Sequence, residues 1–136
     1  MLSDTVSKHL NVPLQRLNYS KRRGNNIDKT IELGVALESI FLHKCSDRDQ
    51  LSYRFRLHGA LFLGNSKHKR LEIFNFLKGF YRLRSDAVHS GGLKKRKSEN
   101  HKEMIDKAIR LCQQSIIKII NMGKFPDWDE LTLGTD

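Results

Sequence analysis

Hydrophobic residues recur with the spacing of an α-helix over most of this sequence. Between residues 28 and 43, four large apolar side chains fall at i, i+4, i+7 and i+8, on one helix face: Leu33, Leu37, Ile40 and Phe41. Asn26 or Asp28 is the expected cap of this helix, because a short polar side chain can accept a hydrogen bond from the first-turn backbone. The sequence has no strand-like alternation, internal repeat or low-complexity tract.

Three further helices are predicted from residues 46 to 123. Their expected starts carry polar capping residues: Ser46 with Asp49, Ser66, and Asn100 with Glu103. Their expected ends are glycines: Gly64, Gly91 and Gly123. The second predicted helix runs through Tyr53, Leu57, Ala60 and Leu61, and the third has Ile73, Leu77 and Phe80 on one line. In the fourth, the expected buried face is Ile105, Ala108, Cys112, Ile116 and Ile119.

Four amphipathic helices joined by short loops predict an all-α domain, an up-and-down four-helix bundle, over residues 28–123. Residues 1–27 have few apolar side chains in register, so we expect an N-terminal arm or the remnant of a linker. Residues 124–136 form a C-terminal tail with the single tryptophan. We expect Trp128 to pack back over the end of the bundle; the alternative is that it stacks on a base.

Charge changes this picture from a generic bundle to one that meets polyanions. The chain has 136 residues, 25 Lys and Arg against 15 Asp and Glu, and a formal net charge of +10, which favours a nucleic-acid partner. Cys45 and Cys112 are far apart and outside metal-ligand or redox spacing, so both are expected as reduced thiols of a cytoplasmic protein. The sequence shows neither a targeting segment nor an apolar run of membrane-spanning length, so no membrane partner is expected.

The third predicted helix carries the most distinctive polar residues. Arg84 continues the apolar line of this helix, where a buried guanidinium must find an anion or an interface. A second, cationic stripe consists of Lys78, Arg82, Ser85 and His89. Arg84 and His89 differ by about 140° around a helix, so they converge only if the arginine reaches across or the last turn relaxes. The spacing alone is not specific, because Arg96 and His101 repeat it.

Three segments together resemble a known family: DKTIELGVALESIFL, LSYRFRLHGALFLG and LKGFYRLRSDAVHSGG. They are similar to HEPN domains, most closely to the ApeA-like branch found in antiviral defence proteins, and the resemblance spans residues 28 to 120. It implies a helical bundle that dimerises and a metal-independent endoribonuclease. The family motif of Arg, a polar residue, three variable residues and His corresponds to Arg84, Ser85 and His89, with Arg82 as the alternative arginine. Glu38 and Arg56 match further family positions.

The chemistry of these residue types suits RNA cleavage. Histidine can act as acid or base near neutrality, and a symmetric dimer would supply two copies of His89 and Arg84 to one cleft. Ser85 can bond the phosphate or only its own backbone, and Glu38 can be a direct acid or a structural partner of Arg84 or Arg56. His58, His68 and His101 are expected at the surface or in an interface. No metal site or cofactor is predicted.

A cluster of cations follows the glycines after the third helix. With one residue of that helix, it predicts a track for RNA phosphates: Lys78, Lys94, Lys95, Arg96 and Lys97. The alternatives are a solvated loop and a nuclear localisation signal. The leading hypothesis is an endoribonuclease homodimer that yields 2′,3′-cyclic phosphate ends, in antiviral defence or a toxin-antitoxin pair, with an antitoxin or sensor as partner.

Two other classes of function compete with this hypothesis. One is a non-catalytic module that binds RNA or nucleotides and dimerises. The other is a basic DNA-binding domain, which is disfavoured because no helix-turn-helix spacing is evident.

Overall fold

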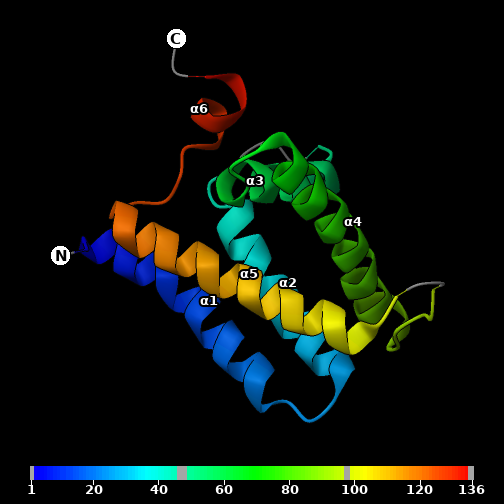
Figure 1. Ribbon diagram of the computed structural model, residues 1–136. Coiled ribbons are helices and arrows are strands. Elements are labelled where there is room, and N and C mark those ends of the chain that lie inside the picture. The colour runs from blue at the N-terminus through cyan, green and yellow to red at the C-terminus, as the bar shows by residue number, and fades with distance from the viewer. Residues whose placement is uncertain (1, 46–48, 97–98, 135–136) are drawn as a thin grey trace.

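The fold is described by a computed structural model over residues 2–45, 49–96 and 99–134. Within these ranges the chain forms six α-helices and no strand, so the predicted all-α class is confirmed. The helices are α1 (Asp4–Arg22), α2 (Asn26–Phe41), α3 (Leu51–Leu63), α4 (Lys67–Ser90), α5 (His101–Met122) and α6 (Trp128–Leu133) (Figure 1). None of the helices in the described ranges combines the length and apolar character that crossing a membrane requires.

The N-terminal segment differs from its prediction. Instead of an arm, residues 4–22 form α1, with the Ser3 hydroxyl accepting a hydrogen bond from the Val6 amide at 3.2 Å. Its buried face consists of Leu10, Pro13, Leu17 and Ser20. Two of these four are not aliphatic, and a proline inside a helix removes a backbone hydrogen bond, so the pattern did not stand out as amphipathic.

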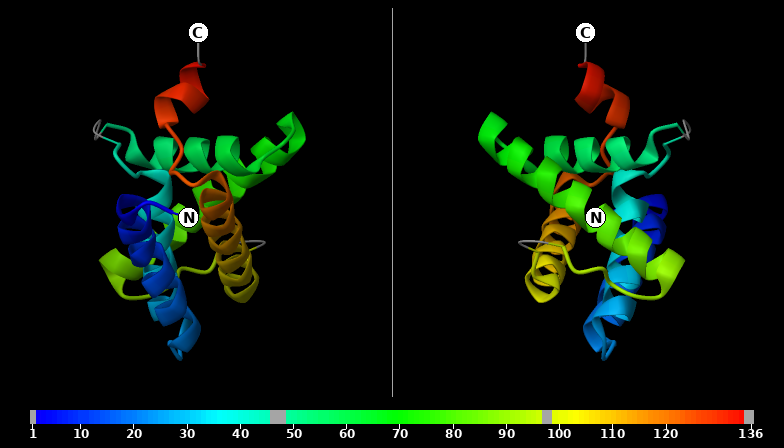
Figure 2. Two further views of the ribbon diagram at one scale, coloured as in Figure 1. Left: turned by 90° about the vertical axis from the view of Figure 1, so that its left-hand side faces the viewer. Right: turned by 90° about the vertical axis from the view of Figure 1, so that its right-hand side faces the viewer.

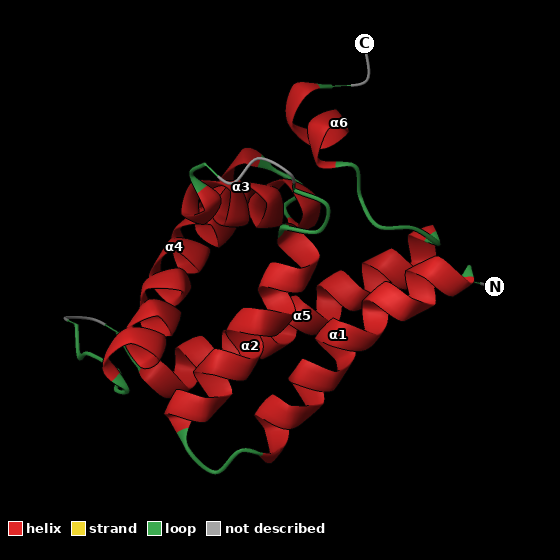
Figure 3. Cartoon of the chain, turned by 180° about the vertical axis from the view of Figure 1, so that it is seen from behind, coloured by secondary structure: helices red, strands yellow, loops and turns green. Residues whose placement is uncertain are grey.

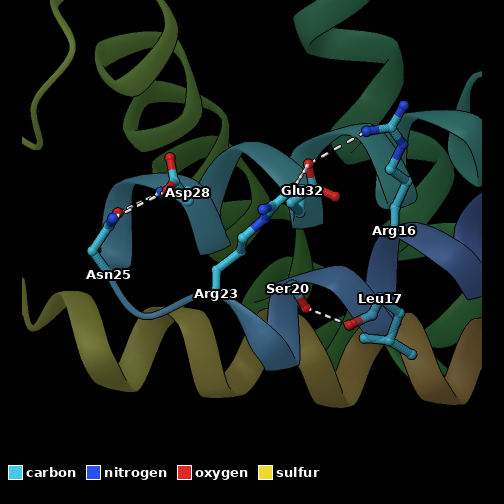
Figure 4. A network of polar contacts seen from close by, with 7 residues as sticks. All are labelled: Arg16, Leu17, Ser20, Arg23, Asn25, Asp28 and Glu32. Atoms are coloured by element: carbon cyan, nitrogen blue, oxygen red, sulfur yellow. Dashed lines mark hydrogen bonds and ion pairs between the residues drawn. The ribbon is translucent and has the colours of Figure 1, made fainter.

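Helices α1 and α2 form an antiparallel hairpin, best seen from behind (Figure 3). A buried acid joins them, Glu32 on α2. Its Oε1 lies 3.3 Å from Arg16 Nη1 and 3.9 Å from Arg23 Nη2 (Figure 4). Because an isolated buried carboxylate is costly, these two arginines are what allows Glu32 to sit at 7% exposure. They also fix the register between the two helices.

Local capping explains where most helices begin and end. Ser66 caps α4 and Asn100 caps α5, as predicted. In each case the side-chain oxygen accepts a hydrogen bond from a first-turn backbone amide, with 3.1 Å between nitrogen and oxygen. Gly91 and Gly123 end their helices with φ of 67° and 73°, the left-handed conformation that glycine adopts without a steric penalty. For α2 the cap is Asn25, next to the predicted Asn26, and it accepts a hydrogen bond from the Asp28 amide at 2.9 Å.

The start of α3 does not follow the predicted capping box. Gln50, with φ of 54°, precedes the helix and makes no side-chain capping bond. Ser46, the predicted cap, lies outside the described residues.

The predicted up-and-down arrangement of four helices is not confirmed. Six helices occur in the described residues, and α2 contacts α1, α3, α4 and α5. Helix α3 lies across the C-terminal end of α2 (Figure 2), and α4 runs from there back toward the start of α5 (Figure 1). At Gly59 a Cβ would lie 2.3 Å from Leu77, which shows how closely α3 and α4 approach.

The core sits around α2 and is closed at one end by the tail. Leu33, Leu37, Ile40 and Phe41 are fully buried, which confirms the predicted stripe of α2. Trp128 is 7% exposed and donates its indole N–H to the His43 carbonyl at 3.1 Å, so the prediction that it packs back is confirmed.

Cys45 and Cys112 are both free, and burial raises the pKa of Cys112 to about 12.

Candidate functional site

The candidate site lies at the C-terminal end of α4. This helix remains α-helical through Ser90 and ends at Gly91, so its last turn does not relax, which was one of the two ways in which Arg84 and His89 could converge. Arg84 and His89 therefore keep the separation of regular helix positions, about 140° around the axis and about 7.5 Å along it. Within one chain, the two side chains leave α4 in different directions.

Arg84 packs directly on α2. A Cβ at Gly34 would lie 2.4 Å from Arg84 Cγ, so the glycine is what leaves room for the arginine stem. One turn later on α2, Glu38 receives the guanidinium: Nε lies 3.2 Å from Oε1, and Nη2 donates to Oε2 at 3.4 Å. The Nε contact is an ion pair without a hydrogen bond, so one hydrogen bond and one close charge contact hold the guanidinium against the carboxylate.

This ion pair explains how Arg84 can lie among the apolar positions of α4, where a guanidinium needs an anion or an interface. Glu38 is the anion, as one of the alternatives from the sequence anticipated, and both side chains remain about one quarter exposed at 25% and 26%. The pair is therefore reachable from solvent and is not sealed into the core. Gly34, four residues before Glu38, was missed because a small residue inside a helix gives no signal until its packing partner is known.

His89 is exposed in the last turn of α4, beside Val88, which is 48% exposed. No hydrogen bond or ion pair joins its ring to any of the described residues, so it is available to a ligand. Ser85, between Arg84 and the helix end, is half-buried. These positions suit contact with a partner molecule more than a role in holding the fold.

Four alternating charges tie the following loop to α4. The distances are between guanidinium nitrogens and carboxylate oxygens. They are 3.5 Å from Arg82 to Glu99, 3.8 Å from Arg96 to Glu99, and 2.8 Å from Arg96 to Asp86. Arg96, predicted to bind RNA, is thus held by two carboxylates and is 26% exposed. Arg82 keeps 54% exposure while pairing with Glu99, so one side of it remains open to solvent.

Sequence reasoning missed the two acids of this network. Asp86 and Glu99 are separated by the glycines and the basic run, and nothing local pairs them with particular arginines. Once the loop folds back on α4, they neutralise part of the predicted cationic track.

The remaining predicted cations divide into two groups. Lys78, Lys94 and Lys95 are exposed, as an RNA-binding surface requires. The loop that carries Lys94 and Lys95 is anchored by His101, whose Nε2 lies 3.1 Å from the Lys94 carbonyl oxygen. Lys97 lies outside the described residues.

Arg56 is not brought to this site. Its guanidinium carbon lies 5.4 Å from the centre of the Tyr53 ring and 5.0 Å from that of Phe74. Its Nη1 donates a hydrogen bond to the Ser52 hydroxyl at 3.2 Å. Phe74 precedes Arg84 by ten residues on α4, roughly 15 Å along the helix axis. Arg56 therefore packs between α3 and the first half of α4, where an arginine can cover aromatic faces.

Among the described residues, no three histidine, cysteine or carboxylate side chains are grouped so that they could hold a metal ion.

No family model matches the chain, and neither the curated proteins nor the solved structures give a significant match.

Proposed function

We propose that the protein is a metal-independent endoribonuclease of the HEPN type that works as a homodimer. The supporting observation is one arrangement: Arg84 is oriented by Glu38 at the surface, on the same helix end as an exposed His89 and a lysine-bearing loop. Because Arg84 and His89 leave α4 in different directions, a cleft containing both calls for a second copy of the helix end. The net charge of +10 favours RNA as the substrate that enters it.

In the proposed reaction, His89 of one copy takes the proton from a ribose 2′-OH. The 2′-oxygen attacks the adjacent phosphorus, the bond from phosphorus to the 5′-oxygen breaks, and the second copy of His89 protonates the leaving oxygen. The products are a 2′,3′-cyclic phosphate and a 5′-OH. Arg84 stabilises the extra negative charge on the phosphorane, with Ser85 as a further hydrogen-bond donor.

The exposed lysines have a separate role in this proposal. Lys78, Lys94 and Lys95 hold the RNA backbone, so affinity falls as salt rises and sequence preference is weak. Antiviral defence or a toxin-antitoxin pair is the setting that the family resemblance suggests, with an antitoxin or sensor as the controlling partner.

Incubation of labelled RNA with the purified protein in EDTA tests this function. Wild type should yield cyclic phosphate ends, and His89→Ala should lower the cleavage rate by roughly 10²- to 10⁴-fold, the usual contribution of acid-base catalysis. His68→Ala is the matched control, because His68 is exposed at the opposite end of α4 and should leave cleavage unchanged. Cleavage by His89→Ala at the wild-type rate would eliminate His89 as the catalytic group.

A non-catalytic RNA-binding and dimerisation module is the second candidate. The ion pair between Arg84 and Glu38 favours it, because a carboxylate at 3.2 Å already neutralises the charge that a phosphate would need. In that case the wild-type protein binds RNA in a salt-dependent way and leaves it uncut. The same cleavage assay, run beside a binding measurement, separates the two candidates.

A further inference from the structure

A second candidate site lies at the other end of the molecule. A cleft of about 490 Å³ is lined by the start of α1, the residues after α2, α3, and the segment 124–129. Helix α5 spans the distance between the two sites, with His101 near the Lys94 loop and Lys124 beside the cleft. Its 22 residues correspond to about 33 Å. The cleft is thus separate from His89 and Arg84.

The cleft has the charge of an anion site. Three cations line it, Lys44, Arg54 and Lys124, against two carboxylates, Asp127 and Asp129. Asp127 also caps α6, where its carboxylate accepts a hydrogen bond from the Glu130 amide at 3.1 Å, and Arg54 donates its Nε–H to the Asp49 carbonyl at 3.0 Å. The two lysines are exposed, so their ammonium groups can turn toward a ligand.

The cleft also contains an imidazole whose charge would respond to a bound anion. The rings of His9 and His43 lie 4.7 Å apart, and His43 packs at 4.1 Å on Phe125. Burial lowers the pKa of His43, and the nearby His9 and Lys44 lower it further. A bound anion would offset that repulsion, because a nearby negative charge favours the protonated ring.

The start of α1 also lines this space. Thr5 lines the cleft from the first turn of this 19-residue helix. The positive end of the helix dipole lies in that turn, which favours a nearby anion. The lining thus comes from α1, the residues after α2, α3 and the tail, so one ligand would bridge four segments.

We propose that this cleft binds a small phosphate-bearing metabolite, of the size of a sugar phosphate. The volume falls within the range of small-molecule sites, roughly 300 to 1,000 Å³. The other charged or titratable side chains that line the cleft are Lys44, Cys45, Arg54, His58, Lys124, Asp127 and Asp129. The proposal does not rest on ribonuclease activity, because it uses none of the residues at the end of α4.

Trp128 offers a direct readout, since it lines the cleft and is the single tryptophan of the chain. Ribose 5-phosphate should change its fluorescence in a saturable way, and calorimetry should give the same affinity, whereas ribose should have no effect. The phosphate itself takes up a proton near pH 6, so the affinity is compared between wild type and His43→Gln over the range from pH about 7.5 to about 5.5. Toward acid, wild type should lose less affinity than His43→Gln, which cannot gain the charge of a protonated ring.

Charge variants locate the ligand. Lys44→Met and Lys124→Met should each weaken binding roughly tenfold, the scale of a lost charged hydrogen bond. Lys102→Met, on the exposed start of α5, is the matched control and should bind as wild type. RNA cleavage should be unchanged in all three, so failure here is distinguishable from failure of the ribonuclease proposal.

Three results would overturn the proposal. One is a lack of saturable binding by ribose 5-phosphate. Another is equal weakening by Lys102→Met, which would indicate attraction by net charge alone. A third is displacement of ribose 5-phosphate by a short 5′-phosphorylated RNA at equal concentration, which would assign the cleft to an RNA end.

Discussion

At the C-terminal end of α4, His89 is exposed and its ring makes no hydrogen bond or ion pair with the described residues, whereas at the opposite end His58 is only 2% exposed. The ring of His58 stacks on Trp128 at 4.4 Å, and its Nδ1 lies 2.6 Å from the Phe41 carbonyl oxygen. His58, expected at the surface or in an interface, is instead buried inside the fold. The same residue type thus serves the fold at one end and is available for chemistry at the other, and burial makes the difference.

Removing Trp128 should have the largest effect on stability. Trp128→Ala leaves a cavity against Phe41, Phe62 and His58, and losses of this kind cost about 3 to 5 kcal/mol. His89→Ala, on an exposed side chain, should change the free energy of unfolding by less than about 0.5 kcal/mol. Urea unfolding of both variants measures the contrast, and similar losses would mean that the two ends do not differ in this way.

Gly34 should show that the α4 end also depends on packing. In Gly34→Ala the new Cβ would meet Arg84 Cγ, so the arginine must move away from Glu38. Overpacking of this kind costs roughly 1 to 3 kcal/mol, and RNA cleavage should fall because Arg84 is displaced. Gly24→Ala is the control, because nothing lies within 4 Å of a Cβ at that position. An unchanged cleavage rate in Gly34→Ala would argue against a role for oriented Arg84.

Acid should weaken the His58 end. Burial is the main cause that lowers the pKa of His58 below its ordinary value of 6.5, with Arg54 lowering it further, while the Phe41 carbonyl and Asp129 oppose this. Because the unfolded chain then binds more protons, stability should be full above pH 6.5 and should fall as the pH drops toward the lowered pKa. One proton accounts for at most about 1.4 kcal/mol per pH unit.

Thermal unfolding at a series of pH values checks this prediction. His58→Asn, which keeps a donor for the Phe41 carbonyl and cannot titrate, should have a shallower slope. The remaining slope would come in part from His43, whose pKa is also lowered. An identical slope in wild type and variant would remove His58 as its source.

The loop network should contribute least. Arg96→Gln removes the pairs with Asp86 and Glu99, but partly exposed ion pairs are worth about 0 to 1 kcal/mol. If Arg96 serves only to hold the loop, RNA affinity should fall less in Arg96→Gln than in Lys95→Gln. A filter-binding series at several salt concentrations compares them. A larger loss of affinity for Arg96→Gln would assign it to direct phosphate contact.

The local features of this protein could be predicted from the sequence. The caps Ser66 and Asn100 and the glycines after α4 and α5 act through neighbours three or four residues away, so a short window contains all the relevant information. The buried face of α2 was equally readable, because its apolar residues share one side of a helix. Glu38 could be foreseen as a partner of Arg84 because a charge on an apolar line requires one.

Tertiary structure alone decided which distant residues meet. Helix α1 was missed because its buried face includes proline and serine, and only packing against α2 shows that they are interior. The pairing of Asp86 with Arg96, the burial of His58 beneath Trp128, and the second cleft all join segments that are far apart in sequence. Such contacts depend on how the helices stack, since the free energy of burial is set by what lies across each interface and not by neighbours along the chain.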